Sequence, residues 1–316
     1  MARLQGTTQE MFTATDHIRK TALESFDCLF TPERNLWTLQ NLMRFHVLFV
    51  EGFDDGQGSF LEKLRNQLRE ADDDVIQLSA ELVYTQQYFT TLTGPEKKIE
   101  NVRTILSWCA RTVPIPEWAI AGVSSGHAAD QSFNQHRPNH VVWLCEYLIH
   151  WRQLTDDDRI RLLRSPWLFA KDVRQIECRH KAFQPMQEAW LFMMFPDSFE
   201  NISSRNDKKR IRSAFQDRVP GVPTDNIDAD LLAIRKHLSQ SEGEGFRFYR
   251  PPIVEQWRTE AKALKGTAKE PPSETSPIVP KAIRADDRSI AEDLDGLAAE
   301  LYLDPPGVLR EWAGSA

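Results

Sequence analysis

The chain has 316 residues, a length that fits about two domains of ordinary size and needs no disulfide or metal ion to complete a core. Its 39 Lys and Arg residues stand against 46 Asp and Glu residues, a net charge of −7, so no overall positive field attracts nucleic acid or an anionic membrane. The longest central apolar run, residues 189–195, is far shorter than the roughly 20 residues that span a bilayer, and the first residues lack the apolar stretch of a secretory signal. We therefore expect a cytoplasmic protein that makes no membrane contact.

The four cysteines indicate neither a disulfide framework nor a metal site. Cys28, Cys109, Cys145 and Cys178 lie far apart and form no C-x-x-C pair. That spacing argues against a zinc knuckle and a redox motif, and it predicts ordinary reduced thiols in the core.

The first third of the chain has the helix start and stop signals of a helical bundle. A helix is predicted over residues 18–29, and a second is predicted to begin at Thr31-Pro32-Glu33, where an N-cap hydroxyl precedes a proline and an acid, and to end at Gly52. Further starts are predicted at Ser59, at Asp72-Asp73-Asp74 and at Gly94-Pro95. These five helices define an expected first domain, residues 1–110.

Residues 111–260 are expected to form a second, mainly helical domain. Residues 119–138 are the most loop-like internal stretch, and 141–154 return to a dense apolar helix pattern. The acids at 156–158 predict a helix start with apolar spacing through 171, and Pro185 introduces a helix that Pro196 ends.

The composition changes after residue 260. Residues 261–288 are rich in Lys, Ala, Glu, Ser and Pro and are expected to be a disordered linker. Residues 289–316 contain one short amphipathic helix pattern and are too few to bury a core of their own. The predicted fold class is mainly α: multi-helical, bundle-like domains with a disordered linker and a short C-terminal helical lead-in.

Several weak motifs favour ordinary structure over chemistry. Residues 122–127 lack the lysine of a phosphate-binding loop, and the proline between His136 and His140 favours a solvated loop over a metal-binding helix. Cys178 and His180 have no second ligand pair at zinc spacing. The sequence therefore predicts no cofactor, no metal and no catalytic residue in this chain.

One basic cluster stands out in an otherwise acidic chain. If residues 203–212 are helical, Arg205, Lys208, Lys209 and Arg212 share one stripe that could contact successive phosphates of DNA. The alternative is a helix face whose cations pair with acids elsewhere in the protein. Both interpretations stay open at this point.

A second candidate lies at residues 246–250, where Arg247 and Arg250 alternate with aromatic residues. Such a mixture can stack bases and neutralise phosphate. A strand or turn that caps the core is the alternative.

Read together, these segments resemble one family. Residues 190–204, WLFMMFPDSFENISS, followed by KKRIRSAF at 208–215, resemble a block upstream of the motor in McrB-like AAA+ NTPases. LLRSPW at 162–167, IDADLLAIR at 227–235 and the lead-in at 294–303 resemble further blocks of that family in the expected order. The Walker A, Walker B and sensor residues of the family have no counterpart among these 316 residues.

The resemblance implies the amino-terminal region of such an NTPase without its AAA+ motor. In this family NTP-driven rings work with a nuclease subunit to restrict modified or foreign DNA, and the variable amino-terminal region selects the target. We therefore expect a non-catalytic recognition or regulatory module of an antiviral restriction system, with an AAA+ motor in cis or in trans, a nuclease subunit and DNA as candidate partners. The alternative is a protein-interaction module that senses a phage protein or docks a partner subunit without touching DNA.

Overall fold

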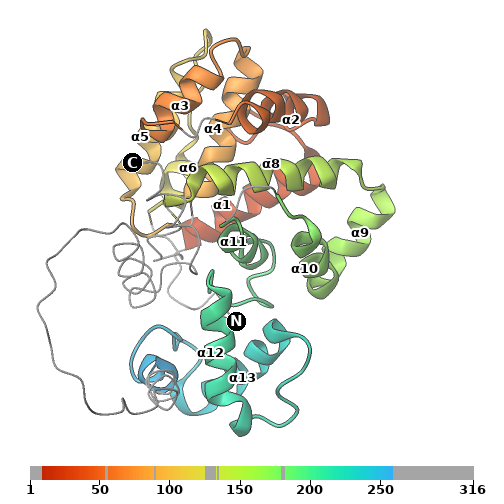
Figure 1. Cartoon of the computed structure of the whole chain (residues 1–316), viewed down its shortest axis with the longest axis vertical. Coiled ribbons are helices and arrows are strands. Elements are labelled where there is room, and N and C mark those ends of the chain that lie inside the picture. The colour runs from red at the N-terminus through yellow and green to blue at the C-terminus, as the bar shows by residue number, and fades with distance from the viewer. Residues whose placement is uncertain are drawn as a thin grey trace, which may run out of the picture. The chain divides into compact units, whose positions relative to one another are not determined.

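A computed structural model describes residues 9–53, 56–88, 90–124, 133, 135–178 and 182–258. These residues form α-helices joined by loops and by short π and 3₁₀ segments, and none of them belongs to a β-strand (Figure 1). The mainly α fold class is confirmed. The expected linker at 261–288 and the lead-in at 289–316 lie outside the described residues.

The chain divides into two compact units, residues 1–205 and 206–316. The helices of the first unit are α1 (Gln9–Arg19), α2 (Leu39–Phe45), α3 (Phe60–Gln67), α4 (Asp73–Gln87), α5 (Pro95–Leu106), α6 (Glu117–Gly122), α8 (Arg137–Gln153), α9 (Asp156–Arg164), α10 (Pro166–Gln175) and α11 (Gln184–Met194), with π-helical segments η2 (Lys20–Ser25) and η3 (His46–Glu51). α12 (Arg205–Phe215) begins at the division, and η4 (Gln216–Arg218) and α13 (Ile227–Glu242) follow in the second unit.

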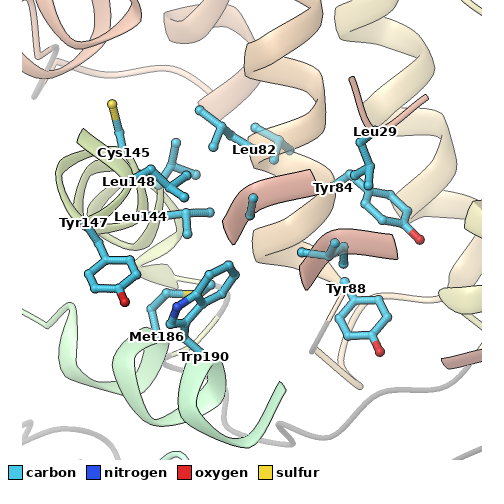
Figure 2. Close-up of a cluster of buried hydrophobic side chains, with 14 of the residues drawn as sticks. Leu29, Leu82, Tyr84, Tyr88, Leu144, Cys145, Tyr147, Leu148, Met186 and Trp190 are labelled. Carbon is cyan, nitrogen blue, oxygen red and sulfur yellow. The ribbon is translucent and has the colours of Figure 1, made fainter. Parts of the chain in front are cut away.

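This division differs from the boundary expected near residue 110. The physical reason is a shared core: α8 packs against α2 and α4, and α11 packs against α1 and α8. Figure 2 shows Leu82 of α4, Leu144 and Leu148 of α8 and Trp190 of α11 in one apolar cluster. Burying each such side chain stabilises the fold by about 1.5–3 kcal/mol, so the helices before and after residue 110 form one unit.

Several predicted helix starts are confirmed by their caps. Ser59 accepts a hydrogen bond from the Glu62 amide while the Glu62 carboxylate accepts one from the Ser59 amide, a complete capping box. Asp72 caps α4 through the Val75 amide, and α5 begins at Pro95 directly after Gly94. Gly52 follows η3 at its C-terminal end, as predicted.

The helix predicted from Thr31-Pro32-Glu33 is wrong. The Asp27 carboxylate accepts hydrogen bonds from the backbone amides of Glu33, Arg34 and Asn35 at 2.6, 2.8 and 2.9 Å. These bonds stabilise a loop, in which Glu33 and Asn35 have left-handed φ values of 73° and 48°. α2 starts instead at Leu39, with Thr38 as its N-cap.

Two further corrections concern helix breaks. The pattern predicted as one helix from Asp156 to Lys171 is two, because Ser165 is extended and its hydroxyl accepts from the Leu168 amide to start α10 at Pro166. The loop expected around His136 and His140 is instead the start of α8, since Pro138 falls in the first turn, where its missing N–H costs nothing.

The second unit has its own small core. Ile211 and Phe215 of α12, Leu231 and Ile234 of α13, and Phe248 and Trp257 after α13 are buried. The Trp257 indole N–H donates to the Phe248 carbonyl at 2.7 Å.

No helix in the described ranges combines the length and apolar character needed to cross a lipid bilayer.

Candidate functional site

The predicted basic stripe lies on α12, and its first residue, Arg205, is the last residue of the first unit. Arg205 Nε donates to Glu188 Oε1 at 2.7 Å, and Arg205 Nη2 donates to Gln187 Oε1 at 2.6 Å. The Glu188 side chain is fully buried and also accepts from Arg174 Nη2 at 2.7 Å. A buried carboxylate requires such partners, so the Arg205 charge serves to satisfy Glu188.

Two other stripe residues pair with the first turn of α13. Lys208 Nζ lies 2.7 Å from Asp228 Oδ1, and both side chains are 1% exposed. Arg212 Nη1 lies 3.3 Å from Asp230 Oδ2, a carboxylate that is itself 1% exposed and also accepts from Thr224. Two carboxylates of α13 therefore neutralise Lys208 and Arg212 of α12.

Lys209 differs from these three residues. Its side chain is exposed, and it forms no ion pair with the residues that the structure describes. The structure thus places one stripe cation in solvent and three in pairs with acids elsewhere in the chain, which is the arrangement that the alternative interpretation described.

The second candidate segment, 246–250, is a turn rather than a strand. Gly243 ends α13 with a φ of 81°, and Arg250 N donates to the Arg247 carbonyl at 3.0 Å. Phe248 is 2% exposed, so it contributes to the core and cannot stack on a base. Tyr249 is 36% exposed, and its hydroxyl donates to Asp207 Oδ2 at 2.9 Å.

The two arginines of this turn border a hollow. It has a volume of about 330 Å³ and is lined by Glu242, Phe246, Arg247, Arg250, Pro251 and Pro252, among others. We call it the arginine hollow. Arg247 is half-buried, Arg250 is exposed, and neither forms an ion pair within the described part of the chain. The structure therefore brings Arg247 and Arg250 together around one concave surface.

A second hollow, in the first unit, escaped the sequence analysis. It has a volume of about 530 Å³ and is lined chiefly by His46, Glu51, Glu146, Glu177 and Cys178. His46 Nδ1 lies 3.6 Å from Glu51 and His46 Nε2 lies 3.6 Å from Glu146. His46 and Glu51 belong to the π-helical segment η3, whose side-chain spacing differs from the 3.6-residue period that sequence patterns detect.

Glu81 on α4 is a buried acid with several hydrogen-bond donors around it, and it was not predicted from the sequence. Its carboxylate accepts from the backbone amides of Leu29 and Phe30 at 2.8 and 3.1 Å and from the Trp37 indole at 2.6 Å. Burial raises the pKa of Glu81. All these donors come from the loop before α2, so Glu81 anchors that loop to α4.

Two other buried titratable groups also have structural partners. His140 Nε2 lies 3.1 Å from the Ala182 carbonyl oxygen, and burial lowers the pKa of His140 to about 3. The Lys98 ammonium donates to the carbonyls of Tyr88 and Val123 at 3.4 Å, and burial lowers its pKa to about 8. His140 therefore links α8 to the segment before α11, and Lys98 links α5 to the residues that follow α4 and α6.

The cysteines and the possible metal ligands can be placed directly. All four cysteines are free thiols; Cys28 and Cys145 are buried, whereas Cys109 and Cys178 are half-buried. Burial, together with the neighbouring Glu81, raises the pKa of Cys28 to about 12. Within the described ranges no three His, Cys, Asp or Glu side chains are placed to hold a metal ion.

Comparison with known proteins adds no relative: no protein-family model, no curated protein and no solved structure matches this chain.

Proposed function

We propose that this chain is a non-catalytic recognition module that binds its target through protein contacts, in the service of an McrB-like NTPase. One observation favours a protein target over DNA. Three of the four cations that could have formed a phosphate-binding stripe are ion-paired with carboxylates whose side chains are at most 1% exposed. To meet a phosphate, each would have to leave a buried acid uncompensated, which costs several kcal/mol.

The overall charge supports the same choice. A protein that binds duplex DNA without base readout relies on Lys and Arg contacts to several phosphates. This chain carries a net charge of −7. The candidate cations outside ion pairs are Lys209, Arg247 and Arg250, from two separate segments.

Local DNA contact is the second candidate, and the arginine hollow is the observation that favours it. Arg247 and Arg250 line one concave surface without carboxylate partners in the described residues. A guanidinium pair suits phosphate as well as carboxylate. In this version Lys209, Arg247 and Arg250 would contact the backbone of the target strand.

The AAA+ motor and the nuclease subunit are partners that the family resemblance supports. The motor would follow in the same polypeptide or act as a separate subunit in the cytoplasm. Target binding by the module would then be communicated to the motor. NTP hydrolysis would occur on the motor, and cleavage on the nuclease subunit.

Copurification tests the proposal. The tagged chain, expressed in its native host during phage infection, is captured with and without nuclease treatment, and each retained protein is then purified and titrated against the purified chain. We expect a partner that survives nuclease treatment and binds directly in the titration. A partner that is lost with nuclease treatment and recovered when duplex DNA is added back would favour the DNA candidate.

A further inference from the structure

We propose that the arginine hollow binds an acidic segment of a partner protein, with a carboxylate between Arg247 and Arg250 and a neighbouring apolar side chain on Phe246 and Pro251. This inference rests on the proposed function, because it names the chemistry of the partner that the module would recognise.

The turn that carries the two arginines is fixed before any ligand arrives. The Arg235 guanidinium lies 4.3 Å from the centre of the Phe246 ring and 5.0 Å from that of Phe248, and its Nη1 donates to the Phe246 carbonyl at 3.3 Å. The Phe246 and Phe248 rings meet edge to face at 5.2 Å. Preorganised backbone reduces the entropy lost on binding.

In the arginine hollow two cations lie on one concave surface without an acid within ion-pair distance among the described residues. Lys208 and Arg212 face Asp228 and Asp230, and Arg210 lies 3.7 Å from Asp207. Arg247 and Arg250, by contrast, meet no carboxylate within ion-pair distance among the described residues. Guanidinium groups bind a carboxylate through paired N–H donors, so an acidic side chain supplies the missing charge.

The lining of the hollow matches a peptide in size and polarity. A volume of about 330 Å³ is near the lower end of ligand pockets, which run from about 300 to 1,000 Å³, and accommodates one or two side chains. Phe246, Pro251 and Pro252 offer apolar surface beside the charges. The Glu242 carboxylate, also in the lining, can accept a hydrogen bond from a peptide N–H.

A nucleic-acid strand fits this surface less well. A strand presents successive phosphates, and Glu242 would repel the one next to the phosphate held by the arginines, whereas the proposed segment places a single carboxylate there. The described part of this unit also exposes five acids, which would repel a phosphate backbone: Asp217, Asp225, Glu242, Glu244 and Glu255. Backbone binding relies on the opposite balance, because affinity grows with the number of phosphates neutralised.

Fluorescence polarisation with defined probes tests the proposal on the full chain. The probes are a labelled peptide of alternating Glu and Phe, the same peptide with Gln in place of Glu, a labelled oligothymidylate and a labelled DNA duplex. We expect the Glu peptide to bind at least about tenfold more tightly than the Gln peptide, the ratio expected when a charged hydrogen bond replaces a neutral one. We expect the double variant Arg247→Gln, Arg250→Gln to lose that preference.

Matched variants control for general charge effects. Lys209→Gln together with Lys236→Gln removes two exposed cations from the same unit and should leave the preference unchanged. The circular dichroism and melting temperature of each variant establish that it is folded, and Arg247→Lys, Arg250→Lys serves as a second test, since it keeps the charge but removes the paired donors.

Three outcomes overturn the proposal: equal affinity for the Glu and Gln peptides, a preference that persists in the Gln double variant, or tighter binding of an oligonucleotide that the Glu peptide cannot displace. The first two leave the proposed protein-binding function intact if copurification still yields a direct partner. The third also contradicts the proposed function and favours nucleic acid.

Discussion

The Lys208 ammonium and the Asp228 carboxylate lie 2.7 Å apart, and each side chain is 1% exposed. A cation that the sequence presents as part of a phosphate-binding stripe is therefore an internal tie between α12 and α13. Its neighbours Arg205 and Arg212 are bound to buried carboxylates in the same way.

Breaking this pair should destabilise the second unit strongly. Lys208→Ala leaves the buried Asp228 carboxylate without its cation, and we expect a loss of about 3–5 kcal/mol. Hydrogen exchange resolved by peptide would show the loss as faster exchange of the α12 and α13 amides. The exposed Lys209→Ala is the matched control and should change stability by no more than about 0.5 kcal/mol.

Replacing both partners should recover much of that loss. In Lys208→Met, Asp228→Leu both charges of the pair are removed together, and apolar side chains of similar volume can replace a buried ion pair at little cost. Denaturant unfolding of the single and double variants measures the coupling. If the double variant were as unstable as the sum of its single variants, the two residues would not act as a pair.

The first unit should become less stable as the pH is lowered, because His140 is buried in its neutral form. Burial lowers the pKa of His140 from 6.5 to about 3 in the folded protein, so between these values the unfolded chain binds a proton that the folded chain does not. The stability that the neutral His140 contributes is therefore fully present above pH 6.5 and is lost as the pH falls toward 3. The free energy of unfolding should change by about 1.4 kcal/mol per pH unit for this one group.

Denaturant unfolding of His140→Gln across this pH range measures the effect. The variant should have a shallower pH dependence than the wild type, and the exposed His237→Gln should not. Parallel curves for wild type and His140→Gln would show that His140 is not buried in its neutral form.

Removing the Asp27 carboxylate should loosen the loop before α2. Asp27→Ala leaves three backbone amides without their acceptor, those of Glu33, Arg34 and Asn35, and we expect a loss of about 1–2 kcal/mol. The hydrogen bonds lower the pKa of Asp27, so the stability that it contributes should disappear as the pH falls below about 4. Amide exchange in residues 28–37 reports the change directly, and a variant with wild-type protection there would contradict the assignment.

Thiol labelling should distinguish the two buried cysteines, Cys28 and Cys145, from the two half-buried ones. Burial raises the pKa of both Cys28 and Cys145, so the reactive thiolate is scarce and inaccessible in the folded protein. Iodoacetamide at neutral pH followed by peptide mass spectrometry should find these two sites unmodified until denaturant is added. Fast labelling of Cys145 in the native protein would show that α8 is not packed as described.

Much of the fold could be predicted from local sequence chemistry. Ser59 with Glu62, Asp72 and Gly94-Pro95 each place a helix start correctly, because capping depends on residues only a few positions apart. The same logic failed at Thr31, where Asp27 satisfies the backbone amides in a competing loop and Glu81, far along the chain, anchors that loop. Local rules cannot detect an acceptor supplied by another helix.

The candidate site depended still more on tertiary structure. The spacing of Arg205, Lys208 and Arg212 correctly indicates one helix, but whether that helix faces solvent or acids is decided by Glu188, Asp228 and Asp230 on other helices. The cluster of Arg247 and Arg250 was visible as a motif, whereas the hollow between them depends on the turn that Gly243 and Arg235 fix. The hollow at η3 had no sequence signal, because π-helical spacing has no period of its own in a short segment.

The most direct test of the account is the affinity of the purified full chain for duplex DNA as the salt concentration is lowered. If Arg205, Lys208 and Arg212 are committed to buried carboxylates, as their ion pairs indicate, binding should stay weak at low salt, and the logarithm of the affinity should change little with the logarithm of the salt concentration. Tight binding with a steep salt dependence, reduced in Lys209→Ala, Arg247→Ala, Arg250→Ala while that variant remains folded, would contradict the account and identify the chain as a DNA-binding module.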